Sequence, residues 1–419
     1  MELELSVRRR VTAAMVKRYR KASKAEKSQI LDRLCEVTCW HRDHARKALR
    51  RAMTAGSGPP RARRSREPVW TYGPEVIEAL RKVWAVLDGP TGKRLAPVMG
   101  ELVASLRRHR ELDITDEVAV GLCAMSAATI DRRLTADRAE LATSRGRTLT
   151  KPGGLLKSQI PMRTWADWNE KIPGFIEVDL VGHDGGDLNG EFCFTLTGTD
   201  IATGWTETRT VRNKAAKWVF GALVEIQANF PFPVLGIDSD NGSEFINQHL
   251  LRWCLDNKIT FTRSRPNNKN DGAHVEQKNW TVVRRTAGYW RYETAREMAV
   301  LNQIWTELSP LTNLFTPQQK LISKTRTGAK VTKKYDTAKT PYQRLLEHPE
   351  QLDQADAKLL AKRFQATNPA QARRDVTDLQ KTLLGMVAHK NTTRRGKQNA
   401  VYLSRAKLNK STTHRPRAT

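Results

Sequence analysis

The sequence predicts an α/β core, a mixed five-stranded sheet flanked by helices, with all-α domains before it and a helical, basic region after it. Three observations predict this fold class. Apolar residues recur at helical spacing over 11–53 and 74–138. At Phe175 the period changes to that of β-strands, and three strand-like runs with Gly-rich turns follow. From residue 214 onward, helical and strand-like segments alternate, which is typical of a mixed sheet covered by helices.

The first part of the chain, 1–53, predicts a helix-turn-helix domain. Ser23 and Glu26 fit a capping box that opens the second helix. The segment 40–52 is predicted to form a third helix, and it is dense in Arg, Lys and His. A helix, a turn and then a basic helix are the outline of a DNA-reading module.

A basic linker at 54–68 leads to a second helical domain at 69–138. The linker holds Gly and Pro breaks and arginines that can follow phosphates; a solvated tether is the alternative. In the second domain, 125–134 predicts a small turn, a Ser/Thr cap and an amphipathic helix, with Ile130 and Leu134 facing the core. This segment resembles the recognition helix of a second helix-turn-helix.

A second extended, basic connector spans 139–172. The connector, the linker and the second helix-turn-helix each contain arginines that we expect to contact DNA. These are Arg61, Arg63, Arg64, Arg66, Arg132, Arg133, Arg145 and Arg147.

The catalytic core is predicted over 173–290, with a helical region at 291–385 and a basic tail at 386–419. The strand-like runs are 175–180, 191–200, 204–211, 234–238 and 260–262. The helical runs are 214–229, 244–257 and 273–290. No acidic residue follows Asp378, so we expect the tail to be disordered by itself and to lie on DNA.

The charge of the chain points to a polyanionic partner. Its 419 residues include 72 Lys and Arg against 44 Asp and Glu, a formal net charge of +28. Nucleic acid is the first candidate and an anionic membrane surface the second. No apolar run approaches the roughly 18–20 residues of a spanning helix, and the N-terminus lacks the apolar segment of a signal peptide. Scattered cysteines are typical of a reduced protein, so we expect a cytoplasmic location without a membrane partner.

Three carboxylates are the candidates for chemistry on that partner. Asp179 lies on the first predicted strand, Asp240 follows the fourth, and Glu276 lies on the helix after a loop; 35 residues separate the last two. Phosphodiester cleavage by two Mg²⁺ ions needs such hard oxygen ligands, which hold the ions about 3.5–4 Å apart. Mn²⁺ suits the same donors. The sequence therefore predicts Asp179, Asp240 and Glu276 as metal ligands and catalytic residues.

Two other acids are alternatives to these ligands. Asp238 lies two residues before Asp240, but the same interval counted from Asp238 ends at His274, which is no carboxylate. Glu177 shares the strand face of Asp179 and is a lesser candidate for the first ligand. Basic side chains near the predicted site are expected to contact phosphates. They are Lys269, Lys278, Arg284 and Arg285.

The motifs around these carboxylates resemble those of the DDE transposase and retroviral-integrase superfamily. Ile-Glu-Val-Asp ending at Asp179 is similar to the first motif, Asp-Asn-Gly-Ser-Glu-Phe at 240–245 to the second, and Ala-His-Val-Glu-Gln-Lys-Asn at 273–279 to the third. Ser264-Arg-Pro and the Thr-Pro-Tyr-Gln-Arg-Leu segment at 340–345 look like bacterial insertion-sequence transposases. The resemblance implies a ribonuclease-H-like core.

The resemblance also implies a function. It is that of a DNA transposase that binds the terminal inverted repeats of a mobile element, cleaves the ends to free 3′-hydroxyls and joins them to target DNA. The expected partners are double-stranded DNA and further copies of the chain, as a dimer or higher oligomer on DNA. Such a protein would be cytoplasmic and nucleoid-associated when bound. The alternatives are a DNA-binding regulator that does not cut and a ribonuclease-H-like nuclease.

Overall fold

The computed structural model describes residues 4–54, 72–143, 172–240, 242, 244–245, 247–263, 273–327 and 330–412. The chain divides into two compact units, 1–71 and 72–419. Each unit has its own hydrophobic core and is described by itself.

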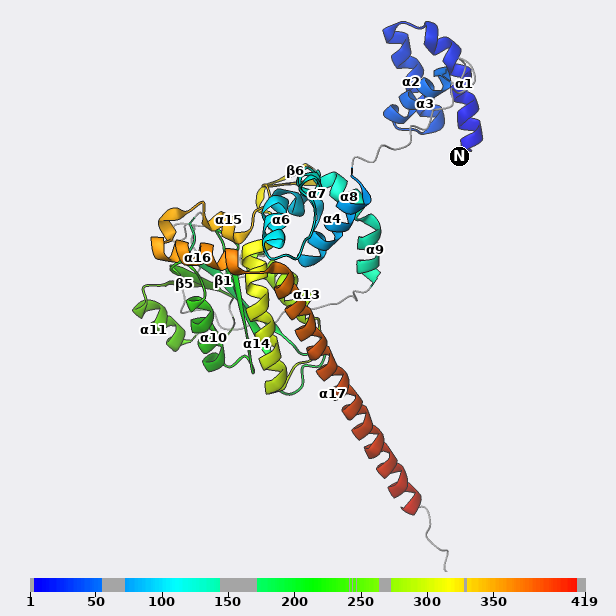
Figure 1. Ribbon diagram of the computed structural model, residues 1–419. Coiled ribbons are helices and arrows are strands. Elements are labelled where there is room, and N and C mark those ends of the chain that lie inside the picture. The colour runs from blue at the N-terminus through cyan, green and yellow to red at the C-terminus, as the bar shows by residue number, and fades with distance from the viewer. Residues whose placement is uncertain are drawn as a thin grey trace, which may run out of the picture. The chain divides into compact units, whose positions relative to one another are not determined.

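The N-terminal unit consists of three helices (Figure 1). They are α1 (Leu5–Lys21), α2 (Lys24–Thr38) and α3 (Arg42–Thr54). The predicted capping box is present: the Ser23 side chain accepts from the Glu26 backbone N–H, and the Glu26 carboxylate accepts from the Ser23 N–H at 2.8 Å. Cys39 ends α2 in the left-handed conformation, with φ 55°, which allows the tight turn into α3. The unit therefore has the helix-turn-helix outline that the sequence predicts.

The second unit is built on the predicted mixed sheet of five strands (Figure 1). The strands are β1 (Phe175–Gly182), β2 (Phe194–Asp200), β3 (Thr206–Val211), β4 (Gly236–Ser239) and β5 (Thr260–Arg263). Their order is β3-β2-β1-β4-β5; β1, β2 and β3 are antiparallel, whereas β1, β4 and β5 are parallel. The first strand therefore lies at the centre of the sheet.

One face of the sheet is apolar, and helices α10 (Ala216–Ala228) and α11 (Gln248–Asp256) cover it (Figure 1). Ile176, Leu196 and Ile237 are fully buried there. A Cβ at Gly198 would stand 2.9 Å from the Ile226 Cδ1 atom, so glycine allows α10 to approach β2 closely. This face forms the main hydrophobic core.

The opposite face is polar, although it is also buried. We call it the polar face, and the register of the strands assigns it Glu177, Asp179, Thr195, Thr197, Thr199, Thr206, Thr208, Thr210, Asp238 and Thr262. Its side chains bond to one another: Thr262 donates to Asp238 at 2.6 Å, and Thr195 and Thr210 share a bond of 2.8 Å. Three helical segments in series cover it, namely α12 (Ala273–Lys278), a π-helix (Asn279–Arg284) and α13 (Arg285–Ala287).

The free edge of β3 is closed by two asparagine side chains from α14 (Ala295–Pro310) and the π-helix after it (Leu311–Phe315). Asn302 accepts from the Thr210 N–H at 2.8 Å and donates to the Thr210 carbonyl at 3.0 Å. Asn313 makes the same pair of bonds with Thr206, at 2.8 and 2.9 Å. Each amide thus replaces the backbone of a missing neighbouring strand.

Helices between residues 74 and 143 belong to the same compact unit as the sheet and share its hydrophobic cluster. They are α4 (Pro74–Val86), α5 (Gly92–Leu95), a 3₁₀ turn (Ala96–Val98), α6 (Met99–Arg108), α7 (Asp116–Cys123), α8 (Ala127–Arg133) and α9 (Thr135–Thr143). Ser126 caps α8 through the Thr129 N–H, and Ile130 and Leu134 are fully buried, as predicted. The second helix-turn-helix outline, α7 to α8, is therefore anchored on the body of the core unit.

The C-terminal region differs from the prediction in two places. Its elements are β6 (Leu321–Thr327), β7 (Lys330–Tyr335), α15 (Pro341–Leu345), a 3₁₀ turn (Pro349–Gln351), α16 (Gln354–Ala366) and α17 (Pro369–Thr412). The hairpin of β6 and β7 begins at Leu321, within 291–325, which is predicted as mostly helical; its second strand lies in 326–345, which the sequence predicts to be extended. The tail from 386 to 412 is helical rather than disordered, because α17 packs along α14 through Val376, Leu383 and Val387 and then continues without an interior proline.

Candidate catalytic site at the sheet edge

The carboxylates Asp179 and Asp240 lie side by side where the pairing between the parallel strands β1 and β4 ends. Val178 on β1 pairs with Ser239 on β4, so the next residue on each strand is a carboxylate. The carboxyl ends of adjacent parallel strands meet at one edge of a sheet, which is where side chains for a site gather. The strand pairing alone therefore brings together two residues that are distant in the sequence.

Asp179 is partly buried and hydrogen-bonded on both oxygens. Its Oδ1 accepts from the Leu180 backbone N–H at 2.7 Å, and its Oδ2 accepts from the Asn279 Nδ2 at 2.6 Å. Burial, together with the negative charges of Asp240 and Glu276, raises the pKa of Asp179 to about 7, although these hydrogen bonds lower it. The three predicted carboxylates are therefore close enough to repel one another.

Asp240 lies at the exposed rim of the site. Its Oδ1 accepts a hydrogen bond from the Gly242 N–H at 2.9 Å, which lowers its pKa. The surrounding protein removes water from the carboxylate, and this larger effect raises the pKa. A Cβ at Gly242 would stand 2.7 Å from the Glu244 carboxyl carbon and 2.9 Å from the Asp240 Oδ1. Only glycine lets the backbone approach both acids this closely.

Glu276 is exposed on α12, and its helix is tied to β1 on both sides of it. The Val275 N–H donates to the Glu177 Oε2 at 3.1 Å, and the Asn279 amide donates to Asp179. Glu177 is thus buried under the start of the helix and positions it. Asn279 stands three residues after Glu276, a spacing that places both on one helix face. That spacing was the available signal for a role of Asn279, which the sequence analysis quotes only as part of a motif.

The two alternative acids have other partners. Glu177 and Asp238 are each only 1% exposed, and Asp238 accepts the short bond from Thr262. Among the residues that the structure describes, no group of three or more His, Cys, Asp or Glu side chains is arranged to hold a metal ion. Strand order brings Asp179 and Asp240 together, and Glu276 is near enough to act on the charge of Asp179. The three candidate ligands do not converge on one point, however.

The basic residues predicted to contact DNA fall into three groups. Those outside the described residues are Arg61, Arg63, Arg64, Arg66, Arg145, Arg147 and Lys269. Arg132 is exposed on α8, where it donates to Thr129 at 3.1 Å, and Arg133 is partly buried. These two stay predicted DNA contacts.

The third group is engaged inside the protein. Lys278 is only 7% exposed, because it shares the sheet-facing side of its helix with Val275; burial and nearby cations lower its pKa to about 7. Arg284 donates to the Gly182 carbonyl at 2.8 Å, and Arg285 forms an ion pair with Asp88 at 2.6 Å. In this structure these side chains are engaged within the core unit. The burial of Lys278 is at odds with the expectation that it faces a phosphate, whereas Arg284 and Arg285 are partly exposed and stay predicted contacts.

Comparison with known proteins defines the class. The family model described as the integrase core domain matches residues 170–269, which hold Asp179 and Asp240. The five-stranded mixed sheet with its flanking helices is the ribonuclease-H-like core of the DDE transposase and integrase superfamily. The function is therefore of the transposase or integrase type, and the activity is of the polynucleotidyl transferase type.

A relative narrows this class to a family. The uncharacterized protein y4rM of Sinorhizobium fredii is 40% identical over 344 residues, which cover 82% of this chain and 96% of the relative. The chain belongs to the same family as y4rM.

Similar solved structures are retroviral. The catalytic core domain of BIV integrase is 17% identical and covers 42% of this chain and 96% of its own, with a TM-score of 0.28. The HTLV-2 integrase catalytic core domain in complex with magnesium, in its dimeric form, is 13% identical and covers 36% of this chain and 93% of its own, also with a TM-score of 0.28.

Among the described helices, none combines the length and apolar character needed to cross a bilayer.

Proposed function

We propose that this protein is a DDE transposase that binds the ends of a mobile element, cleaves them to free 3′-hydroxyls and joins those to target DNA. One observation carries the proposal: Asp179, Asp240 and Glu276, from a strand, a strand end and a helix, lie within mutual electrostatic reach inside an integrase-type core. Like charges grouped around the partly buried Asp179 are costly unless a cation or a proton relieves them.

The donor chemistry of this group suits a divalent cation. Carboxylate oxygens are the ligands that Mg²⁺ and Mn²⁺ prefer, and burial together with the neighbouring carboxylates raises the pKa of Asp179, which a bound cation would oppose. Asp179, Asp240 and Glu276 would hold two ions, which supply an activated attacking oxygen and a stabilised leaving oxygen. The three residues do not converge in this structure. To bind an ion, Asp179 would give up one of the hydrogen bonds that it now accepts.

The protein's own residues prepare this arrangement. Asn279 fixes one oxygen of Asp179, and the Gly242 N–H orients one oxygen of Asp240. Glu177 holds the start of α12 and so keeps Glu276 over the end of β1. Such positioning groups keep ligands in a productive geometry before the substrate arrives.

DNA is the substrate that the rest of the chain favours. The net charge of +28 suits a polyphosphate, and two helix-turn-helix outlines, α2–α3 and α7–α8, offer helices for its grooves. Two element ends must be joined in one event, so we expect a homo-oligomer on double-stranded DNA. Arg132, exposed on α8, is a described basic residue available for such a contact.

Nicking of DNA that spans the boundary of the element tests the proposal. Full-length protein with Mg²⁺ should release a product with a free 3′-hydroxyl at the element end, and EDTA should prevent it. Glu276→Gln should abolish the product, whereas the control Glu225→Gln, an exposed acid paired with Arg209 on the other side of the sheet, should retain it. Asn279→Ala should lower the rate by about 10- to 100-fold, as expected for a group that orients a ligand.

Three outcomes would contradict the proposal. Tight binding without nicking by the unmodified protein would identify a DNA-binding regulator. Equal product from the unmodified protein and Glu276→Gln would show that the carboxylates are not the catalytic groups. Preferential cleavage of an RNA–DNA hybrid would identify a ribonuclease-H-like nuclease instead.

A further inference from the structure

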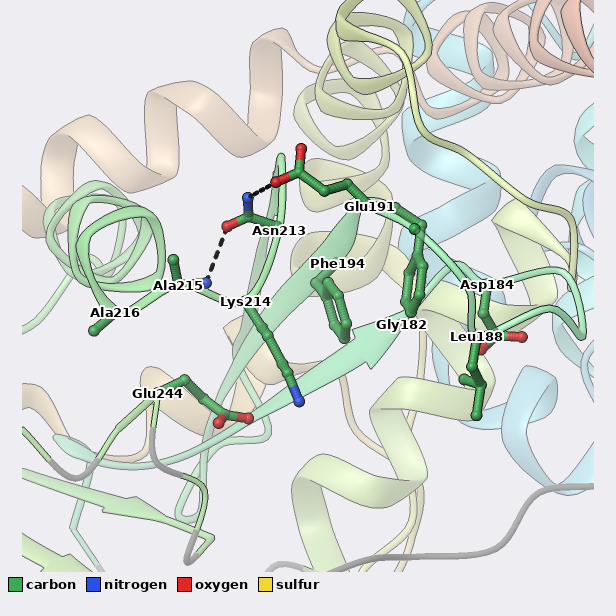
Figure 2. Close-up of a pocket in the computed structure, with 12 residues that line it drawn as sticks. Gly182, Asp184, Leu188, Glu191, Phe194, Asn213, Lys214, Ala215, Ala216 and Glu244 are labelled. Atoms are coloured by element: carbon green, nitrogen blue, oxygen red, sulfur yellow. Dashed lines mark hydrogen bonds between the residues drawn. The ribbon is translucent and has the colours of Figure 1, made fainter.

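A cavity of about 860 Å³ opens beside the proposed catalytic edge (Figure 2). Its walls come from the end of β1, the turn before β2, the start of α10 and the segment after β4. This volume falls within the range of pockets that hold small organic groups, and most of the lining is apolar. None of the proposed catalytic steps uses it.

One wall of the cavity is aromatic. The rings of Phe192 and Phe194 stack with centroids 4.9 Å apart and an interplanar angle of 25°. The Arg291 guanidinium lies 5.4 Å from the Phe192 ring and holds the turn behind it through the carbonyls of Asp187 and Asn189. This wall is therefore held in place, as a stacking surface needs to be.

Glycine at position 182 makes room for these rings. A Cβ there would stand 3.1 Å from the Phe194 Cε1 and 3.3 Å from the Phe192 Cε2. The last residue of β1 thus lets both rings lie against the strand that carries Asp179. The aromatic wall and the proposed catalytic strand are directly joined.

The polar lining disfavours a phosphate inside the cavity. Three carboxylates, those of Asp184, Glu191 and Glu244, line it together with one ammonium, that of Lys214. Asp184 accepts from the Gly186 N–H at 2.6 Å, and Glu191 accepts from Arg212 at 3.2 Å. A neutral, planar group with amino hydrogens suits such a lining better than an anion does.

Glu244 and Lys214 point toward each other across the cavity, and Phe194 stands beside them (Figure 2). The Glu244 carboxyl carbon and the Asp240 Oδ1 both lie within 3.0 Å of the position that a Cβ on Gly242 would take, so the two acids are neighbours. The cavity therefore opens next to the position of the phosphodiester that the proposed site would cleave. A group that enters the cavity would therefore belong to the nucleotide next to the cleaved bond.

We propose that this cavity receives an unpaired DNA base that carries an exocyclic amino group, adenine or cytosine, from the nucleotide beside the cleaved bond. The ring stacks on Phe194, the amino group donates to Glu244, and Lys214 meets the phosphate at the mouth. This inference rests on the proposed function, because it takes DNA as the substrate. Extrusion of one base would align the backbone at the carboxylates.

Fluorescence anisotropy in EDTA tests this without catalysis. The probes are labelled short duplexes that end in a single-stranded overhang of adenines, of thymines or of abasic sites. The full chain should bind the adenine overhang about 5- to 100-fold more tightly than the abasic one, in line with the stacking of one base on an aromatic ring. The thymine overhang should bind more weakly than adenine, since thymine offers Glu244 no amino group.

Variants locate the effect. Phe194→Leu and Phe192→Leu should bring the adenine-to-abasic ratio near one while blunt-duplex affinity, which reports intact folding, stays unchanged. Phe220→Leu is the control, because Phe220 is also a partly buried ring in an aromatic pair, with Trp253, outside the cavity. Glu244→Leu, which has no hydrogen-bond acceptor, should remove the preference for adenine over thymine.

The outcomes separate this inference from the function on which it rests. Failure to bind any duplex would overturn both. Duplex binding with equal affinity for adenine and abasic overhangs would overturn the base pocket alone. Binding of free deoxyadenosine monophosphate as tightly as the adenine overhang would also overturn it, because the cavity would then be a mononucleotide site.

Discussion

The two faces of the five-stranded sheet are both buried, yet they are built from opposite chemistry. The face under α10 is made of Ile176, Leu196 and Ile237, and it packs as an ordinary core. The polar face under α12 carries threonines and acids, and it is held by hydrogen bonds between side chains. The same strands supply both, because neighbouring residues alternate between faces. One face provides stability, and the other holds the candidate site.

The comparison shows why the carboxylates can be gathered at all. Burial of acids such as Glu177 and Asp238 is tolerated only where donors meet them, here the Val275 N–H and Thr262. The apolar face, with α10 pressed against Gly198, supplies the free energy that offsets this arrangement. Three substitutions test whether the apolar face supplies stability while the polar face holds the candidate site. They follow in order of the expected change in stability.

The largest change is expected on the apolar face. Leu196→Ala removes a fully buried side chain and leaves a cavity, so the free energy of unfolding should fall by about 2–5 kcal/mol. Urea unfolding followed by circular dichroism measures this. A loss below about 1 kcal/mol would mean that this face is not the main source of stability.

A smaller, pH-dependent change is expected from Asp179. Its pKa is about 7 in the folded protein and 3.8 when unperturbed, so the folded state holds the proton more tightly. Without metal, stability should therefore fall as the pH rises from about 4 to 7, by at most ~1.4 kcal/mol for each unit of pKa shift. Asp179→Asn lacks this titration and should be the more stable protein at pH 8, but not at pH 4.

The difference between the two proteins isolates Asp179 from other groups, such as Glu207, whose pKa burial also raises to about 7. Thermal melts in EDTA across this pH range measure it. Mg²⁺ at pH 8 should raise the melting temperature of the unmodified protein and leave that of Asp179→Asn nearly unchanged. A difference that is constant with pH would contradict the interpretation.

The smallest change is expected from Thr197→Val on the polar face. Thr197 stands opposite Asp179 on β2, and within the described residues its buried hydroxyl has no hydrogen-bond partner. An isosteric methyl group removes an unsatisfied polar atom, so stability should stay unchanged or rise by up to about 1 kcal/mol. A marked loss, measured by urea unfolding, would show that the hydroxyl has a partner in solution, such as a water molecule.

Much of the site could be predicted because its signals are local. Asp179 and Asp240 stand in recognisable strand-end motifs, and a fixed interval leads to Glu276. The alternation of β1 also predicted that Glu177 would share a face with Asp179, although it could not show that Glu177 holds α12. The mixed sheet followed from the change of period at Phe175.

The remainder depends on docking between distant segments. Lys278 looks like a surface lysine in the sequence, but its exposure is decided by which side of α12 meets the sheet. The helix that continues into the tail starts from the packing of α17 on α14, which reaches Val387 and which composition does not reveal. Asn302 lies 92 residues from its partner on β3, so no local pattern could pair them.

The amides of Asn302 and Asn313 also set a condition on how this protein is made. Residues 173–290 contain the whole sheet and all three carboxylates, but the outer edge of β3 stays open until residue 313 is in place. A nascent or truncated chain that ends earlier presents two unpaired sets of backbone groups to any other strand it meets. The core thus contains all of the proposed catalytic residues well before it is protected from aggregation.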